Sequence, residues 1–289
     1  MAELTGELDE KRERLIELLR SYGSCAVAFS GGVDSTVVAK AAQLALGARA
    51  VAVTGVSASL AEGELDDARR LAQSIGIRHE VISTEEFSRP QYVRNDPDRC
   101  YHCKSELYGR LEHLLPRLGV AVIVNGANRD DAGDYRPGMV AGAEHAVRSP
   151  LLECAFTKDE VRSLAAQWQL PVWDKPATPC LSSRVAYGEE VTPERLAMID
   201  EAERFLRARG CSPLRVRYHR GEMARIELDP EQLSRLTEPS VRQEVLARLK
   251  SLGFRYVTLD LEGFRSGSMN QVLPPESIKR IYPATNPEA

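Results

Sequence analysis

The segment that most constrains the fold is SGGVDST at residues 30–36, which joins an apolar run to a helical one. The preceding CAVAF, residues 25–29, is apolar throughout, as is typical of a strand buried on both faces of a parallel sheet. An alanine-rich stretch with helical character follows. A glycine turn between strand and helix aims the backbone N–H groups of the first helical turn at an anion. The segment therefore predicts an anion site at the end of a buried strand.

The alternation of strand and helix continues along the first 130 residues. Such alternation predicts a doubly wound parallel α/β sheet whose ligand lies at the carboxyl ends of the strands. Two polar connections, 85–104 and 128–139, are long enough to be functional, and we expect both to reach that edge. The further strands are expected at 49–55, 79–84 and 120–126, and the helices at 60–75 and 105–118.

A second compositional region follows and predicts a smaller α+β domain. It contains alternating strands and amphipathic helices. We therefore expect residues 1–188 to form the first domain and residues 189–289 to form the second. The strands are expected at 214–219, 223–228 and 255–261, and the helices at 193–209 and 241–252.

Composition narrows the class of protein. The 289 residues are 43% hydrophobic, which is enough for a substantial core, and the net charge of −4 provides no basic surface of the kind that nucleic-acid binders carry. The charged N-terminal stretch does not resemble a signal peptide, and no long apolar run follows. We expect a cytoplasmic protein with neither a membrane nor a nucleic-acid partner.

The turn itself carries groups suited to phosphate. Two glycines allow close backbone approach, three hydroxyls can donate hydrogen bonds, and a carboxylate can bind the Mg²⁺ that accompanies pyrophosphate. A glycine turn that only caps a helix is the alternative. The segment lacks the patterns GxxxxGK[ST] and GxGxxG, which disfavours γ-phosphate transfer and hydride chemistry. The candidate residues are Ser30, Gly31, Gly32, Asp34, Ser35 and Thr36, with Asp34 also a catalytic candidate.

SGGVDST resembles the PP-loop of the N-type ATP pyrophosphatases. That resemblance implies an adenine nucleotide alpha hydrolase-like fold, and an enzyme that cleaves ATP between its α- and β-phosphates to adenylate a carbonyl oxygen. In the 128–139 connection and just before it, polar residues are candidates for contacting the nucleotide or Mg²⁺, although turn chemistry is an alternative explanation. These residues are Gly126, Asn128, Asp130 and Asp131.

Three of the six cysteines suggest chemistry. Cys100 and Cys103 form a CxxC, and Cys180 lies in TPCLSSR. A lone CxxC is compatible with zinc, a redox disulfide or chance. With no second CxxC, a closed four-ligand zinc site is disfavoured, whereas three thiolates with one open position would suit a [4Fe–4S] cluster.

Four motifs, DRCYHCK, NGANRDDAGDYRPG, PATPCLSSR and RVRYH, occur in this order and together resemble LarE. That family makes the sulfur-bearing nickel-pincer nucleotide of lactate racemase. The resemblance implies adenylation of pyridinium-3,5-biscarboxylic acid mononucleotide and its conversion to a thiocarboxylate, in a homo-oligomer. One form of the family sacrifices a cysteine sulfur, at the position of Cys180, and another is thought to hold a [4Fe–4S] cluster on the three cysteines.

The second domain contributes a candidate anion site. Arg215 and Arg217 lie two apart on an expected strand, so both point to one side, where the resemblance implies phosphate binding. Two solvated charges are the alternative. Glu203 is expected to orient the pair, Arg184 to act on the nearby thiol or an adenylate, and Ser183 to supply a hydrogen bond.

Two rival functions remain open at this stage. A tRNA-thiolating PP-loop enzyme also combines this loop with a CxxC and a distant third cysteine, but the acidic charge disfavours it. An ammonia-using amidotransferase similar to NAD synthetase would need no active-site cysteine. Dependence of turnover on Cys180 separates the latter from a sulfur transferase.

Overall fold

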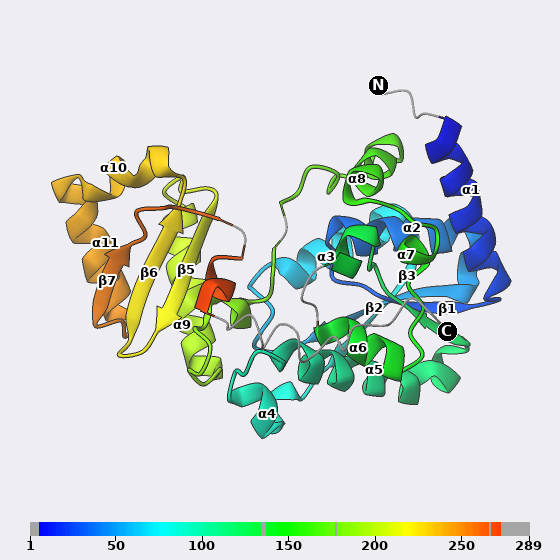
Figure 1. Ribbon diagram of the computed structural model, residues 1–289, viewed down its shortest axis with the longest axis horizontal. Coiled ribbons are helices and arrows are strands. Elements are labelled where there is room, and N and C mark those ends of the chain that lie inside the picture. The colour runs from blue at the N-terminus through cyan, green and yellow to red at the C-terminus, as the bar shows by residue number, and fades with distance from the viewer. Residues whose placement is uncertain (1–5, 134–136, 177, 266, 273–289) are drawn as a thin grey trace. The chain divides into compact units, whose positions relative to one another are not determined.

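The computed structural model describes residues 6–133, 137–176, 178–265 and 267–272 (Figure 1). The chain divides into two compact units. The first draws on residues within 1–57, 62–86 and 100–178, and the second on residues within 58–61, 87–99 and 179–289. The boundary between residues 188 and 189 stays a prediction. Two short segments from the first half of the sequence thus belong to the second unit.

The first unit contains a four-stranded sheet in the order β3-β2-β1-β4, and every pair in it is parallel. The central strands β1 and β2 are apolar because both of their faces are covered, whereas β3 at the edge carries polar residues and is mostly exposed or half-buried. The doubly wound parallel sheet predicted from the sequence is confirmed. Its strands are β1 (Cys25–Ala28), β2 (Ala50–Val56), β3 (Arg78–Ser83) and β4 (Val122–Val124).

Alternate residues of these strands enter two separate cores, one on each face of the sheet. Val27 and Ala52 pack in the first core, whereas Ala26 and Val51 pack in the second. Figure 1 shows helices on both faces of this sheet. On the first face lie α1 (Gly6–Ser21), α2 (Val33–Leu46), α3 (Glu64–Ile75), α7 (Pro150–Glu153) and α8 (Lys158–Gln167); on the second lie α5 (Arg99–Leu118) and α6 (Pro137–Glu144).

The second unit contains a three-stranded sheet in the order β5-β6-β7, antiparallel between the first pair and parallel between the second. The apolar side chains of α9 and β5 are buried together with those of β6. This confirms the predicted smaller α+β sheet. Its elements are α4 (Pro90–Val93), α9 (Pro193–Arg207), β5 (Leu214–His219), β6 (Met223–Leu228), α10 (Leu233–Thr237), α11 (Pro239–Ser251) and β7 (Tyr256–Leu259).

The connection at 85–104 differs from the expectation of one long loop. It contains α4 and the first residues of α5, so the CxxC lies on a helix. Asp96, Pro97 and Asp98 immediately precede this helix, and acidic residues and proline are typical of helix N-termini. The connection at 128–139 likewise runs into α6 at Pro137, while residues 134–136 lie outside the described residues.

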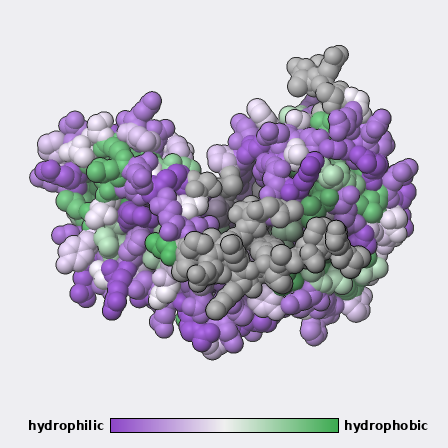
Figure 2. Space-filling model, viewed as in Figure 1, coloured by the Kyte–Doolittle hydropathy of each residue, from purple (hydrophilic) through white to green (hydrophobic). Residues whose placement is uncertain are grey.

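The surface drawn in Figure 2 is mostly hydrophilic on each unit. Among the described helices, none is long and apolar enough to cross a membrane.

Candidate functional site

The loop at residues 30–36 is held by its own hydroxyl groups. Ser35 donates from Oγ to the Gly32 carbonyl at 3.1 Å, and Thr36 donates from Oγ1 to the same oxygen at 2.8 Å. Ser30 Oγ lies 3.2 Å from Ser35 Oγ. Gly31 has a φ of +71°, a conformation that favours glycine. Buried Thr36 therefore supports the loop, while exposed Ser30 can face a ligand.

Asp34, in the first turn of α2, is the charged centre of this site. Its Oδ1 accepts a hydrogen bond from Asn128 Nδ2 at 3.1 Å, and its Oδ2 accepts one from Lys158 Nζ at 2.5 Å. About a quarter of the Asp34 side chain remains exposed. The structure thus brings together a carboxylate, an amide and an ammonium from three segments that are far apart in the sequence.

Lys158 was missed by the sequence analysis. It is the first residue of α8, directly after Thr157, which forms a capping box with Glu160. A basic residue in the first helical turn opposes the helix dipole, and this unfavourable position was a signal that Lys158 serves another purpose. Its ammonium can neutralise Asp34 or bind a phosphate oxygen.

The 126–131 segment holds the partners of Asp34 in place. The backbone N–H of Asn128 donates to Asp131 Oδ2 at 3.0 Å, and the N–H of Asp130 donates to Asn128 Oδ1 at 3.0 Å. Asp130 Oδ2 in turn accepts from the backbone N–H of Lys158 at 2.8 Å. Asp131 is therefore part of the turn, while Asp130 fixes the start of α8.

Gly126 allows β4 to approach the loop closely. A Cβ at this position would lie 2.8 Å from the backbone N of Ser35 and 3.0 Å from the carbonyl carbon and Cβ of Asp34. No side chain fits such a distance from backbone atoms, so glycine is required here by sterics.

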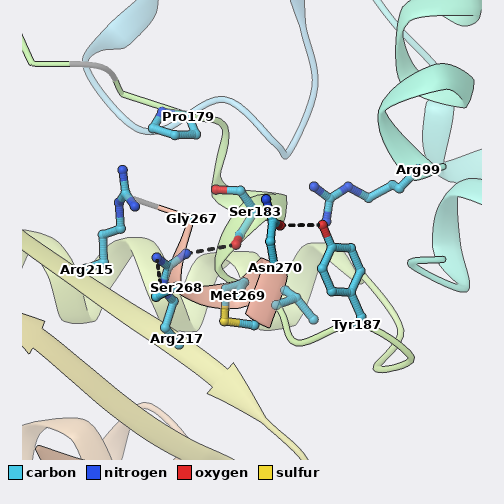
Figure 3. Close-up of a pocket in the computed structure, with 11 residues that line it drawn as sticks. Arg99, Pro179, Ser183, Tyr187, Arg215, Arg217, Gly267, Ser268, Met269 and Asn270 are labelled. Carbon is cyan, nitrogen blue, oxygen red and sulfur yellow. Dashed lines mark hydrogen bonds between the residues drawn. The ribbon is translucent and has the colours of Figure 1, made fainter. Parts of the chain in front are cut away.

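The second unit has a polar cavity of about 160 Å³ (Figure 3). Pro179 and Ser183, which flank Cys180 in the sequence, contribute to its lining. Tyr187 donates a hydrogen bond to Asn270 Oδ1 at 3.1 Å across another part of the wall. Three guanidinium groups also line it, those of Arg99, Arg215 and Arg217.

Arg215 and Arg217 lie on one side of β5, as predicted, but they are buried rather than solvated. Arg217 is paired with buried Glu227 and also donates to the carbonyl of Ser183 at 3.0 Å. Within the described part of the chain, Arg215 forms no hydrogen bond or ion pair, and its guanidinium stacks over Phe264 at 4.6 Å. Burial, followed by the charges of neighbouring arginines, lowers the pKa of Arg215 to about 10. The cavity therefore favours an anion.

Glu203 binds Arg184 and the backbone between the two arginines of β5. Its buried carboxylate accepts from Arg184 Nε at 3.1 Å and from the backbone N–H of Val216 at 3.0 Å, whereas Glu227 pairs with Arg217. An orienting role of Glu203 toward Arg215 and Arg217 stays a prediction, while Glu227, on the adjacent strand β6, is the carboxylate paired with Arg217.

Arg184 is likewise buried and bound to its own loop. Its Nη1 donates to the carbonyl of Cys180 at 3.0 Å and to Ser183 Oγ at 3.1 Å. Ser183 also donates from Oγ to the Cys180 carbonyl, at 2.8 Å. Both residues thus hold the backbone that carries the exposed Cys180.

Comparison with known proteins extends these observations to the whole chain. A family model described as NAD synthase matches residues 13–102, which contain the loop at residues 30–36. The chain is 40% identical to pyridinium-3,5-bisthiocarboxylic acid mononucleotide synthase of Lactiplantibacillus plantarum, over 92% of this chain and 96% of that protein. The chain belongs to the LarE family.

Two further relatives match this chain to different extents. An uncharacterised protein of Synechocystis is 47% identical over 92% of this chain and 99% of its own length. A glutamine-hydrolysing GMP synthase of Aeropyrum pernix is 30% identical, but only over 62% of this chain and 38% of its own length. The LarE relationship therefore covers both units, whereas the likeness to GMP synthase is partial.

The cysteines of this LarE family member fall into two groups. Cys25, Cys154 and Cys211 are buried, and burial raises the pKa of Cys25 to about 12. Cys100 and Cys103 lie three apart on α5, on one side of the helix. Cys180 belongs to the second unit. The buried group has the character of core residues.

The donor groups of the chain suit the two metal sites that the family implies to different degrees. Partly exposed Asp34 suits Mg²⁺, which commonly takes one or two carboxylates and completes its shell with phosphate and water. Three thiolates suit iron and sulfide chemically. Among the described residues, however, no three His, Cys, Asp or Glu side chains are grouped as a metal site.

Proposed function

We propose that this enzyme adenylates a carboxylate of pyridinium-3,5-biscarboxylic acid mononucleotide with ATP and Mg²⁺, and then replaces the activated oxygen with sulfur from Cys180. The observation that carries the proposal is an exposed thiol on a loop whose flanking residues line an arginine-rich cavity, in a member of the LarE family. The PP-loop and its family relatives support the use of ATP with Mg²⁺.

In the adenylation step, a substrate carboxylate oxygen attacks the α-phosphorus of ATP and pyrophosphate leaves. The backbone N–H groups at the start of α2 and the ammonium of Lys158 would stabilise the negative charge that develops on the leaving group. Asp34 would hold Mg²⁺, which supplies charge neutralisation at the phosphates when bound. Lys158 and Asn128 now occupy the Asp34 oxygens, so binding of MgATP would exchange these contacts.

In the sulfur-transfer step, the Cys180 thiolate attacks the acyl-adenylate and AMP leaves, forming a thioester. A base then removes the Cα proton of Cys180, the Cβ–Sγ bond breaks, and the electron pair leaves with the sulfur. The products are a thiocarboxylate and dehydroalanine. The cavity would bind the substrate phosphate through Arg215, which forms no hydrogen bond or ion pair among the described residues, with help from Arg217 and Ser183.

A catalytic version of this reaction would use a [4Fe–4S] cluster on Cys100, Cys103 and Cys180. Such a cluster supplies an open iron that can carry an exchangeable sulfide. Iron and sulfide analysis of anaerobically purified wild type and Cys100→Ala tests it. Iron and sulfide that are lost in the variant support the cluster, and metal-free wild-type protein contradicts it.

The sulfur donor is tested by incubating the protein with ATP, Mg²⁺ and the dicarboxylate mononucleotide. We expect pyrophosphate, AMP and a thiocarboxylate product, with dehydroalanine in the Cys180 peptide by mass spectrometry if no cluster is present. Cys180→Ala should release pyrophosphate but form no thiocarboxylate, and Cys211→Ala, a buried control, should do both. Thiocarboxylate formation by Cys180→Ala refutes the role of this cysteine. Turnover that incorporates ammonia would instead favour an amidotransferase.

The expectations of a cytoplasmic location, a homo-oligomer and no nucleic-acid partner stay predictions. Cell fractionation, light scattering and tRNA binding would test them.

A further inference from the structure

The loop after Cys180 is bound to a segment from far earlier in the sequence, residues 87–99, which lies within the 85–104 connection. The two segments belong to the same compact unit. Cys180 precedes the short 3₁₀ helix Leu181–Arg184. What holds this helix decides where the thiol is presented.

Two side chains of the earlier segment bind Ser182, which is fully buried in that helix. The hydroxyl of Tyr92 lies 2.6 Å from Ser182 Oγ, and Arg99 donates from Nη1 to the Ser182 carbonyl at 2.7 Å. Tyr92 is itself 1% exposed and packs edge-on against Phe87. These are buried hydrogen bonds between parts of the chain that are about ninety residues apart.

Asn95 binds the residues that follow the helix. It has a φ of 58°, in the left-handed region that asparagine tolerates, and is completely buried. Its Nδ2 donates to the carbonyls of Val185 and Ala186 at 3.2 and 2.8 Å, and its Oδ1 accepts from Arg99 at 2.5 Å. Every hydrogen-bonding atom of the Asn95 amide group is therefore used.

We infer that Tyr92, Asn95 and Arg99 are positioning residues for sulfur transfer, because they fix the loop that presents the Cys180 thiol. This inference rests on the proposed role of Cys180 as the donor. The cost of an unpaired buried polar group makes the network stiff, and a stiff loop keeps a nucleophile in reach of its electrophile. The proposed adenylation step uses the loop at residues 30–36, which belongs to the other unit. Loss of one of these hydrogen bonds should therefore slow sulfur transfer and leave adenylation unchanged.

The test compares Tyr92→Phe with Tyr218→Phe. Tyr218 is an equally buried tyrosine of the same unit, on the side of β5 opposite Arg215 and Arg217, and within the described chain its hydroxyl forms no hydrogen bond. Single-turnover sulfur transfer and pyrophosphate release are measured at saturating substrate, with hydrogen exchange at residues 181–186. We expect Tyr92→Phe to slow sulfur transfer and to speed exchange by about tenfold, while pyrophosphate release and the control variant stay unchanged.

A second variant keeps the inference falsifiable. Ser182→Ala removes the other hydroxyl of the hydrogen bond between Tyr92 and Ser182. The double variant Tyr92→Phe, Ser182→Ala should therefore transfer sulfur no more slowly than either single variant. Unchanged exchange and sulfur transfer in Tyr92→Phe, or an equal loss of both chemical steps, would overturn the inference. If Cys180→Ala still transfers sulfur, the proposed donor fails, and the exchange measurement alone decides whether these residues hold the loop.

Discussion

Gly126→Ala should damage the ATP site by pushing two backbones apart. The new Cβ would meet the Ser35 nitrogen at 2.8 Å, whereas ordinary contacts begin near 3.4 Å, so β4 and the start of α2 must separate by about 0.6 Å. Overpacking of this kind costs about 1–3 kcal/mol of stability. Asp34, which also lies against the new Cβ, would shift with the helix.

The effect on catalysis can be larger than the effect on stability. A misplacement of about 1 Å can cost roughly a hundredfold in rate, so we expect pyrophosphate release to fall about ten- to a hundredfold. Urea unfolding and pyrophosphate release are measured together. The control is Gly109→Ala, where a Cβ meets only His145 at an ordinary 3.8 Å and alanine favours the helix. Gly126→Ala protein with the stability and activity of wild type would refute the steric argument.

Three further predictions concern charge. Lys158→Met should lower the rate of pyrophosphate release about a hundredfold, since it removes a cation beside Asp34, and Lys158→Arg should restore part of it. Arg215→Gln should weaken the binding of inorganic phosphate about ten- to a hundredfold by calorimetry, and exposed Arg255→Gln should not. Burial lowers the pKa of His79 in the folded protein, so as the pH falls the histidine of the unfolded chain is protonated first. The free energy of unfolding should therefore decline below about pH 6.5. Thermal melts of His79→Gln should show a smaller decline.

Much of the fold was predictable because its signals are local. Apolar strands alternating with amphipathic helices follow from residue periodicity, and the strands Leu214–His219 and Met223–Leu228 were predicted with their observed bounds. Helix α10 was not predicted, and α5 begins several residues earlier than expected. The polar residues up to 104 were assigned to the connection, so the helix was expected only from residue 105.

The candidate site was less predictable because it depends on partners. Asp34 could be named from its motif, but Lys158 lies 124 residues away and has no motif of its own. The partner of Arg217 proved to be Glu227 on the adjacent strand, which lies diagonally across from it, two residues beyond its register partner Arg225. Such cross-strand neighbours depend on the strand pairing and not on sequence distance. Burial of polar residues such as Asn95 also follows only from the folded chain.

The buried Arg215 has a practical consequence for biochemists who purify this enzyme. This buried guanidinium forms no ion pair among the described residues, so a small oxyanion that enters its cavity should bind to it. Storage in phosphate or sulfate should therefore give a protein that melts at a higher temperature, by ligand linkage. The same salts would compete with the substrate phosphate for this cavity. Protein stored in phosphate or sulfate would therefore be the most stable but would show the lowest apparent affinity for the substrate. Activity assays should use an amine or sulfonate buffer.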